Sequence, residues 1–109
     1  MSYWIYLKDK NGGTVEVDSH AEGASANFWG SPRATLNVTV NYRALFNFNS
    51  LYGLTGQESI AHLREAVLTL GTQKDDNHWG VTFGNVGHHC SILLEWAENN
   101  PQAVWDVHS

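Results

Sequence analysis

The sequence predicts an α+β fold in which a three-stranded antiparallel sheet carries about three α-helices on one face. Residues 3–8, which are rich in β-forming side chains, and residues 35–40 both follow the period of two that is typical of a half-buried strand. In residues 56–70 the apolar side chains recur at helical spacing, between a start signal and a stop signal. The chain has 109 residues, about the length of one domain, so we expect a single globular domain over 1–109.

The sheet is expected to begin with a hairpin. Its first strand spans residues 3–8, and the pair Asn11-Gly12 tolerates the positive φ that a tight turn requires. Its second strand spans residues 14–18, and the third strand of the sheet spans residues 35–40. Residues 19–34 show no alternation, and a connection of this length is often either mobile or functional.

The central helix has the clearest signals in the chain. Thr55 and Glu58 have the spacing of a capping box, in which each side chain binds a backbone N–H at the helix start. Gly71 supplies the stop signal, so the helix is expected over 56–70. One apolar stripe is expected to be buried, and it consists of Ile60, Leu63, Val67 and Leu70.

Two further helices are expected, over residues 42–49 and 85–99. The second of them can be capped by Thr82 or Asn85. Its apolar positions form a broad stripe, so we expect it to be largely buried. Residues 103–108 are expected to form an extended segment at an edge of the sheet.

Charge and composition exclude several classes of function. Lys and Arg number 6 against 11 Asp and Glu, the net charge is −5, and no Lys or Arg follows Lys74. We therefore expect no binding to nucleic acid, because such binding depends on bases that neutralise phosphates. No apolar run approaches the ~20 residues that span a bilayer, so no membrane association is expected. The single cysteine, Cys90, fits a reducing compartment, and we expect a cytoplasmic location.

A cluster near the C-terminus has the residue types that bind zinc: His88, His89 and Cys90, with His78 and His108 nearby in sequence. Adjacent helical residues point about 100° apart, whereas two ligands on one helix need a spacing of three or four residues. Cys90 also falls on the apolar stripe, where a thiol is inert. We therefore expect no metal, no cofactor and no catalytic residue. A small metal-assisted enzyme that uses these histidines is the alternative.

Two aromatic segments are candidates for binding a partner protein. Phe28 and Trp29 lie in the long connection with Arg33, and His78 and Trp79 precede the last expected helix. Large aromatic residues are favoured as interface anchors. The alternative is that both tryptophans fold back onto the core.

Several short stretches of the sequence, spread over most of the chain, carry a resemblance. They are Met1-Ser2-Tyr3, Val40-Asn41-Tyr42 leading to Phe46, residues 51–56, Glu58-Ser59-Ile60, Trp79, Gly84-Asn85 and residues 103–106. In these stretches the chain resembles a family of small, mostly uncharacterised proteins encoded by bacteriophages, prophages and other mobile elements. The family has no established catalytic residues, so the resemblance implies none here.

The resemblance implies a binding function. Small acidic proteins of this origin often bind a host protein, for example to block a defence system. We therefore expect a non-enzymatic binding module in the host cytoplasm, with a host or phage protein as its partner. A minor virion or morphogenesis component is a further alternative, and it would assemble into homo-oligomers.

Overall fold

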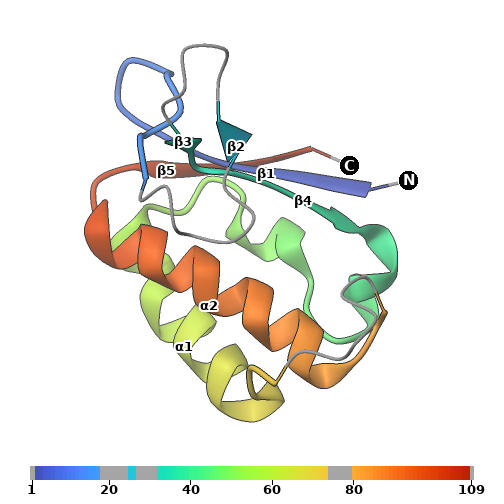
Figure 1. Ribbon diagram of the computed structural model, residues 1–109. Coiled ribbons are helices and arrows are strands. Elements are labelled where there is room, and N and C mark those ends of the chain that lie inside the picture. The colour runs from blue at the N-terminus through green and yellow to red at the C-terminus, as the bar shows by residue number, and fades with distance from the viewer. Residues whose placement is uncertain (1, 18–24, 27–31, 74–79, 109) are drawn as a thin grey trace.

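The computed structural model describes residues 2–17, 25–26, 32–73 and 80–108, and it has two layers. One layer is a three-stranded antiparallel sheet in the order β4-β1-β5, and the helices all lie on one side of it (Figure 1). The strands of this sheet are β1 (Ser2–Lys8), β4 (Thr35–Thr39) and β5 (Val104–His108). A separate pair of short strands is formed by β2 (Ser25–Ala26) and β3 (Pro32–Arg33). The predicted α+β class is confirmed, although the described residues form two α-helices rather than about three.

The membership of the sheet differs from the prediction. The central strand β1 pairs with β4 on one side and with β5 on the other, so that Ile5 lies between Leu36 and Val107. The terminal segment lies at an edge of the sheet, as predicted, and it forms a full strand there. The strand expected over 14–18 is wrong for its described part, because residues 14–17 make only isolated bridges at Thr14 and Glu16.

The expected turn does form, and it shows why the second strand fails. Gly12 has a φ of 84°, and Asp9 N–H donates to the Gly13 carbonyl at 2.8 Å. After the turn, Val15 N–H donates to the Leu7 carbonyl, but Leu7 N–H donates to Ala34 rather than to Val15. The segment after the turn thus reaches only the end of β1, because β4 occupies the rest of that edge.

The helix expected over 42–49 is wrong, because two short 3₁₀-helices take its place. They are η1 (Val40–Ala44) and η2 (Phe48–Leu51). Asn47 is extended and caps η2 by accepting the Asn49 N–H at 3.1 Å. Phe46 and Phe48 are both buried, with ring centroids 4.9 Å apart. In one continuous helix these two side chains would point about 200° apart, so the break allows both to enter the core.

The central helix α1 (Gly56–Leu70) has the predicted bounds. Thr55 Oγ1 accepts the Glu58 N–H at 3.1 Å, and Glu58 Oε1 accepts the Thr55 N–H at 2.9 Å. The predicted burial is only partly right. Leu63 is fully buried, whereas the other three residues of the stripe, Ile60, Val67 and Leu70, are half-buried.

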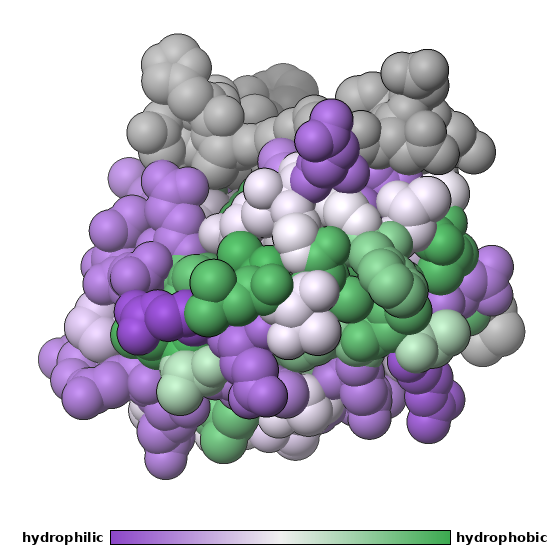
Figure 2. Space-filling view, turned by 90° about the horizontal axis from the view of Figure 1, so that it is seen from below, coloured by the Kyte–Doolittle hydropathy of each residue, from purple (hydrophilic) through white to green (hydrophobic). Residues whose placement is uncertain are grey.

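The helix α2 (Phe83–Asn99) begins two residues before the expected start, with Thr82 as its N-cap. It packs along α1. Figure 2 shows the side of the molecule opposite the sheet, where apolar and polar residues are mixed. The start of α2 lies very close to the end of α1. A Cβ added at Gly87 would lie only 1.7 Å from the Gly71 carbonyl oxygen.

The core lies between the sheet and the helices. Its largest fully buried side chains are those of Trp96, Trp105, Tyr3, Tyr42 and Phe48. The Trp105 indole N–H donates to Ser59 Oγ at 2.8 Å, and Ser59 in turn donates to the Gly56 carbonyl at 2.7 Å. This chain of hydrogen bonds fastens β5 to α1, so the edge strand is held by both layers.

Candidate functional site

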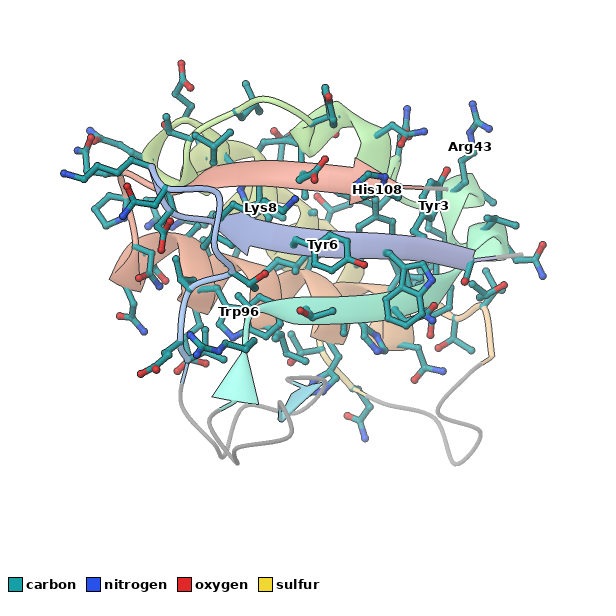
Figure 3. The ribbon with its side chains drawn as sticks, turned by 90° about the horizontal axis from the view of Figure 1, so that it is seen from above. Tyr3, Tyr6, Lys8, Arg43, Trp96 and His108 are labelled. Carbon is teal, nitrogen blue, oxygen red and sulfur yellow. The ribbon has the colours of Figure 1, made fainter. Side chains whose placement is uncertain are left out.

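The sheet has one face that the helices do not cover. Because side chains alternate along a strand, Tyr3, Ile5 and Leu7 of β1 enter the core while the intervening side chains point away from it. Figure 3 looks onto this outer face, with Tyr6, Lys8 and His108 in view. We call it the open face. By register it consists of Trp4, Tyr6 and Lys8 of β1, Thr35, Asn37 and Thr39 of β4, and Val104, Asp106 and His108 of β5.

A polar network centred on Asp106 lies on the open face. Its Oδ2 atom accepts hydrogen bonds from Lys8 Nζ at 2.7 Å and from His108 Nε2 at 2.9 Å. The Lys8 ammonium lies 5.5 Å from the Tyr6 ring centre, and the His108 ring meets the Tyr6 ring edge-on at 5.7 Å. Strand pairing creates this cluster, because it sets Tyr6 opposite Asp106.

The network changes the acidity of Asp106. The hydrogen bond from Lys8 is the main cause that lowers the pKa of this carboxyl, and the hydrogen bond from His108 lowers it further. Partial burial acts in the opposite direction. Asp106 therefore stays ionised under neutral conditions and keeps Lys8 and His108 in place.

Acid should weaken this network. A lowered pKa in the folded state means that Asp106 stabilises the fold above its ordinary pKa of 3.8 and loses that contribution as the pH falls through the folded value. The pair is partly exposed, so we expect Asp106→Asn to cost at most about 1 kcal/mol at neutral pH. Urea unfolding at neutral and at acidic pH measures this. Lys8→Met should give the same loss. If the stability of the Asp106→Asn variant falls with acid as much as that of the unaltered chain, the prediction is wrong.

Aromatic side chains are unusually exposed around this network. Trp4 has 42% of its surface exposed although it lies on the central strand, and Tyr52, which follows η2, has 65% exposed. A hollow of about 320 Å³ opens at this side of the sheet. It is lined by Lys8, Tyr52, Gly53, Val104, Trp105 and Asp106. The open face thus combines flat aromatic surface with a shallow depression at the β5 edge.

Among the described residues, the parts of a catalytic triad do not come together. Asp106 and His108 form the carboxylate–imidazole half of a triad, but in the described part of the chain His108 has no hydrogen bond with a hydroxyl or a thiol. The Cys90 thiol is fully buried, as predicted, and burial raises its pKa to about 12. A neutral thiol inside the core cannot serve as a nucleophile.

The structure describes only one of the five residues predicted to bind a partner. Phe28, Trp29, His78 and Trp79 lie outside the described residues. Arg33 lies on β3, where its Nη1 donates to the Thr14 carbonyl at 3.3 Å and lies 3.4 Å from Glu16 Oε1. Its guanidinium therefore ties β3 to the segment after the first turn.

The histidines of the described segments do not assemble into a metal site. Over residues 2–17, 25–26, 32–73 and 80–108 no three His, Cys, Asp or Glu side chains are grouped so as to hold a metal ion. The His89 ring is buried against Tyr42, with centroids 5.5 Å apart, and its Nδ1 donates to the Asn85 carbonyl at 2.7 Å. His108 lies in the other layer, on the open face.

Sequence reasoning did not single out the open face, although one signal was present. Val104, Asp106 and His108 alternate with the buried Trp105 and Val107, which is the pattern of a strand with one exposed side. The pattern does not reveal which strand is the neighbour. Pairing with β1 is what brings the charged and aromatic side chains together.

Comparison with known proteins adds no assignment. None of the helices in the described part of the chain combines the length and the apolar character needed to cross a membrane. No protein-family model matches the sequence, and neither a curated protein nor a solved structure shows significant similarity to it.

Proposed function

We propose that this chain is a non-enzymatic binding module of the mobile-element type, which docks on a host protein through the open face. One observation carries the proposal. The exposed Trp4 and the half-buried Tyr6 lie on the central strand, and polar side chains from both edge strands surround them. Interfaces have this anatomy, with aromatic residues at the desolvated centre and a polar rim.

The charge on the open face indicates what kind of partner fits. Lys8 and Asp106 neutralise each other across 2.7 Å, although the whole chain carries a charge of −5. The polar residues of β4 on this face, Thr35, Asn37 and Thr39, are uncharged. The fitting partner is therefore a folded protein with a flat, apolar and nearly neutral patch. Binding should change little between low salt and about 1 M salt, where charges are screened beyond about 3 Å.

Site-specific photo-crosslinking tests this docking surface. A benzoylphenylalanine in place of Tyr6 should form one dominant adduct with a host protein. The same group in place of Phe83, which is 63% exposed on the helical side, should not form that adduct. Equal adducts from both positions would contradict the proposal. An adduct with a second copy of the chain would instead favour a self-assembling virion or morphogenesis component.

The affinity for the crosslinked protein provides the quantitative test. Tyr6→Thr removes the ring and keeps a strand-forming residue, so the fold should persist while binding weakens by about 2 kcal/mol or more, as for an interface anchor. Isothermal titration calorimetry with the purified partner measures the loss. Leu68→Ala, which changes an exposed residue of α1, is the control and should bind normally. If Tyr6→Thr binds as well as the unaltered chain, the docking surface lies elsewhere.

A further inference from the structure

A second hollow, of about 220 Å³, lies in the helical layer, between α1 and the segment that joins η1 to η2. We call it the α1 hollow. It is lined by Leu45, Phe46, His62, Glu65, Ala66, Thr69 and Leu70. Pockets for drug-sized ligands usually measure about 300–1,000 Å³, so the α1 hollow has room for about one side chain.

Its walls are apolar and partly aromatic. Leu45, Ala66 and Leu70 supply aliphatic surface, and the rings of Phe46 and His62 lie with centroids 5.0 Å apart and planes inclined by 32°. A planar cation is attracted to the face of such a ring, and an aliphatic stem gains from burial against the neighbouring methyl groups.

Its polar groups act mainly as hydrogen-bond acceptors. Ser50 donates its hydroxyl proton to the Asn47 carbonyl at 2.6 Å, so His62 Nε2, 3.0 Å from Ser50 Oγ, must act as the donor in that contact. In the neutral ring Nδ1 is then an acceptor. The Glu65 carboxylate forms no hydrogen bond or ion pair with the residues that the structure describes. Among the residues that the structure describes, no Lys or Arg lines the hollow.

The two helices around the hollow carry mostly negative charge, as the hollow itself does. The helices α1 and α2 carry four glutamates, Glu58, Glu65, Glu95 and Glu98, but no Lys and only one Arg, Arg64, which pairs with Glu98 at 3.5 Å. A cationic group that approaches this layer therefore meets a favourable field.

We propose that the α1 hollow is an anchor site for one arginine side chain of a partner protein. The guanidinium would bind the Glu65 carboxylate and lie against the Phe46 and His62 rings, while its methylene stem packs on the apolar wall. Arginine fits better than lysine because its flat fork can bind a carboxylate with two N–H groups and stack on a ring at once. The site lies in the helical layer, away from the open face, so it does not depend on the function proposed above.

NMR titration of the ¹⁵N-labelled chain with N-acetyl-arginine methylamide tests the site. We expect saturable shifts at Ala66, Thr69 and Leu70, with a dissociation constant in the millimolar range. The matched probe N-acetyl-citrulline methylamide has almost the same shape but no charge, and it should bind about tenfold more weakly or not at all, since a charge-assisted hydrogen bond is lost. Equal shifts with both probes, or no shifts with the arginine probe, would overturn the proposal.

Matched variants separate the hollow from the general acidity of the helices. Glu65→Gln should weaken the arginine probe about tenfold, whereas Glu95→Gln, which removes the same charge from an exposed site on α2, should change binding less than about twofold. An equal loss in both variants would show non-specific attraction and overturn the proposal. Tyr6→Thr should bind the probe normally, so this site and the open face can fail independently.

Free arginine identifies the source of the side chain. Its α-ammonium and α-carboxylate cancel each other in charge, and neither has a partner in the proposed site, so free arginine should bind no more tightly than the blocked probe. Tighter binding of free arginine would assign the hollow to a small metabolite and overturn the partner-protein proposal.

Discussion

Leu63→Ala should destabilise the fold by about 2–5 kcal/mol, because it removes a fully buried side chain from the centre of α1 and leaves a cavity. Leu63 is the only residue of the predicted stripe of α1 that has no exposed surface. Urea unfolding followed by circular dichroism measures the change as a lower midpoint with an unchanged slope.

The matched control for this prediction lies on the same helix. Leu68 is 80% exposed, so Leu68→Ala deletes the same atoms from a solvated position and should change stability by no more than about 0.5 kcal/mol. Similar losses in the two variants would mean that α1 does not face the core as the structure shows.

Gly87→Ala should be similarly severe, for a steric reason. The added Cβ would lie 1.7 Å from the Gly71 carbonyl oxygen and 3.0 Å from Leu70 Cβ, so α2 would have to move away from the end of α1. Alanine favours a helix over glycine by about 0.5–1 kcal/mol, but forced overpacking costs about 1–3 kcal/mol and occasionally more. The clash involves backbone, which cannot rotate aside, so we expect a net loss of about 2 kcal/mol or more by urea unfolding.

A glycine in open space is the control for Gly87. A Cβ at Gly12 would meet nothing within 4 Å, and only its φ of 84° opposes alanine, at about 1–2 kcal/mol. The Gly12 variant should therefore keep native contacts between α1 and α2 in the NMR spectrum, whereas the Gly87 variant should shift resonances along both helices. A Gly87→Ala chain that is as stable as the original would refute the close approach of the helices.

The sequence alone determined the features that depend on neighbouring residues. The bounds of α1 follow from Thr55, Glu58 and Gly71, whose side-chain and backbone preferences act within a single turn. The turn at Gly12 and the inward position of Cys90 are local in the same sense, since each depends on spacing along one element. The prediction overestimated the burial of Ile60, Val67 and Leu70. Periodicity indicates which face of a helix is apolar but not how much of that face the neighbouring elements cover.

Only the tertiary structure decided which strands pair and where polar groups meet. Two segments could pair with β1 on its β4 side, and β4 takes most of that edge because Leu36 and Val38 are buried there. The break at Asn47 likewise serves distant contacts, since it lets Phe46 and Phe48 share one core. The open face depends on the pairing of β5 with β1, two segments nearly a chain length apart. Which of several distant segments pairs with a strand depends on how much apolar surface each pairing buries. The pattern of residues within one segment does not contain that information.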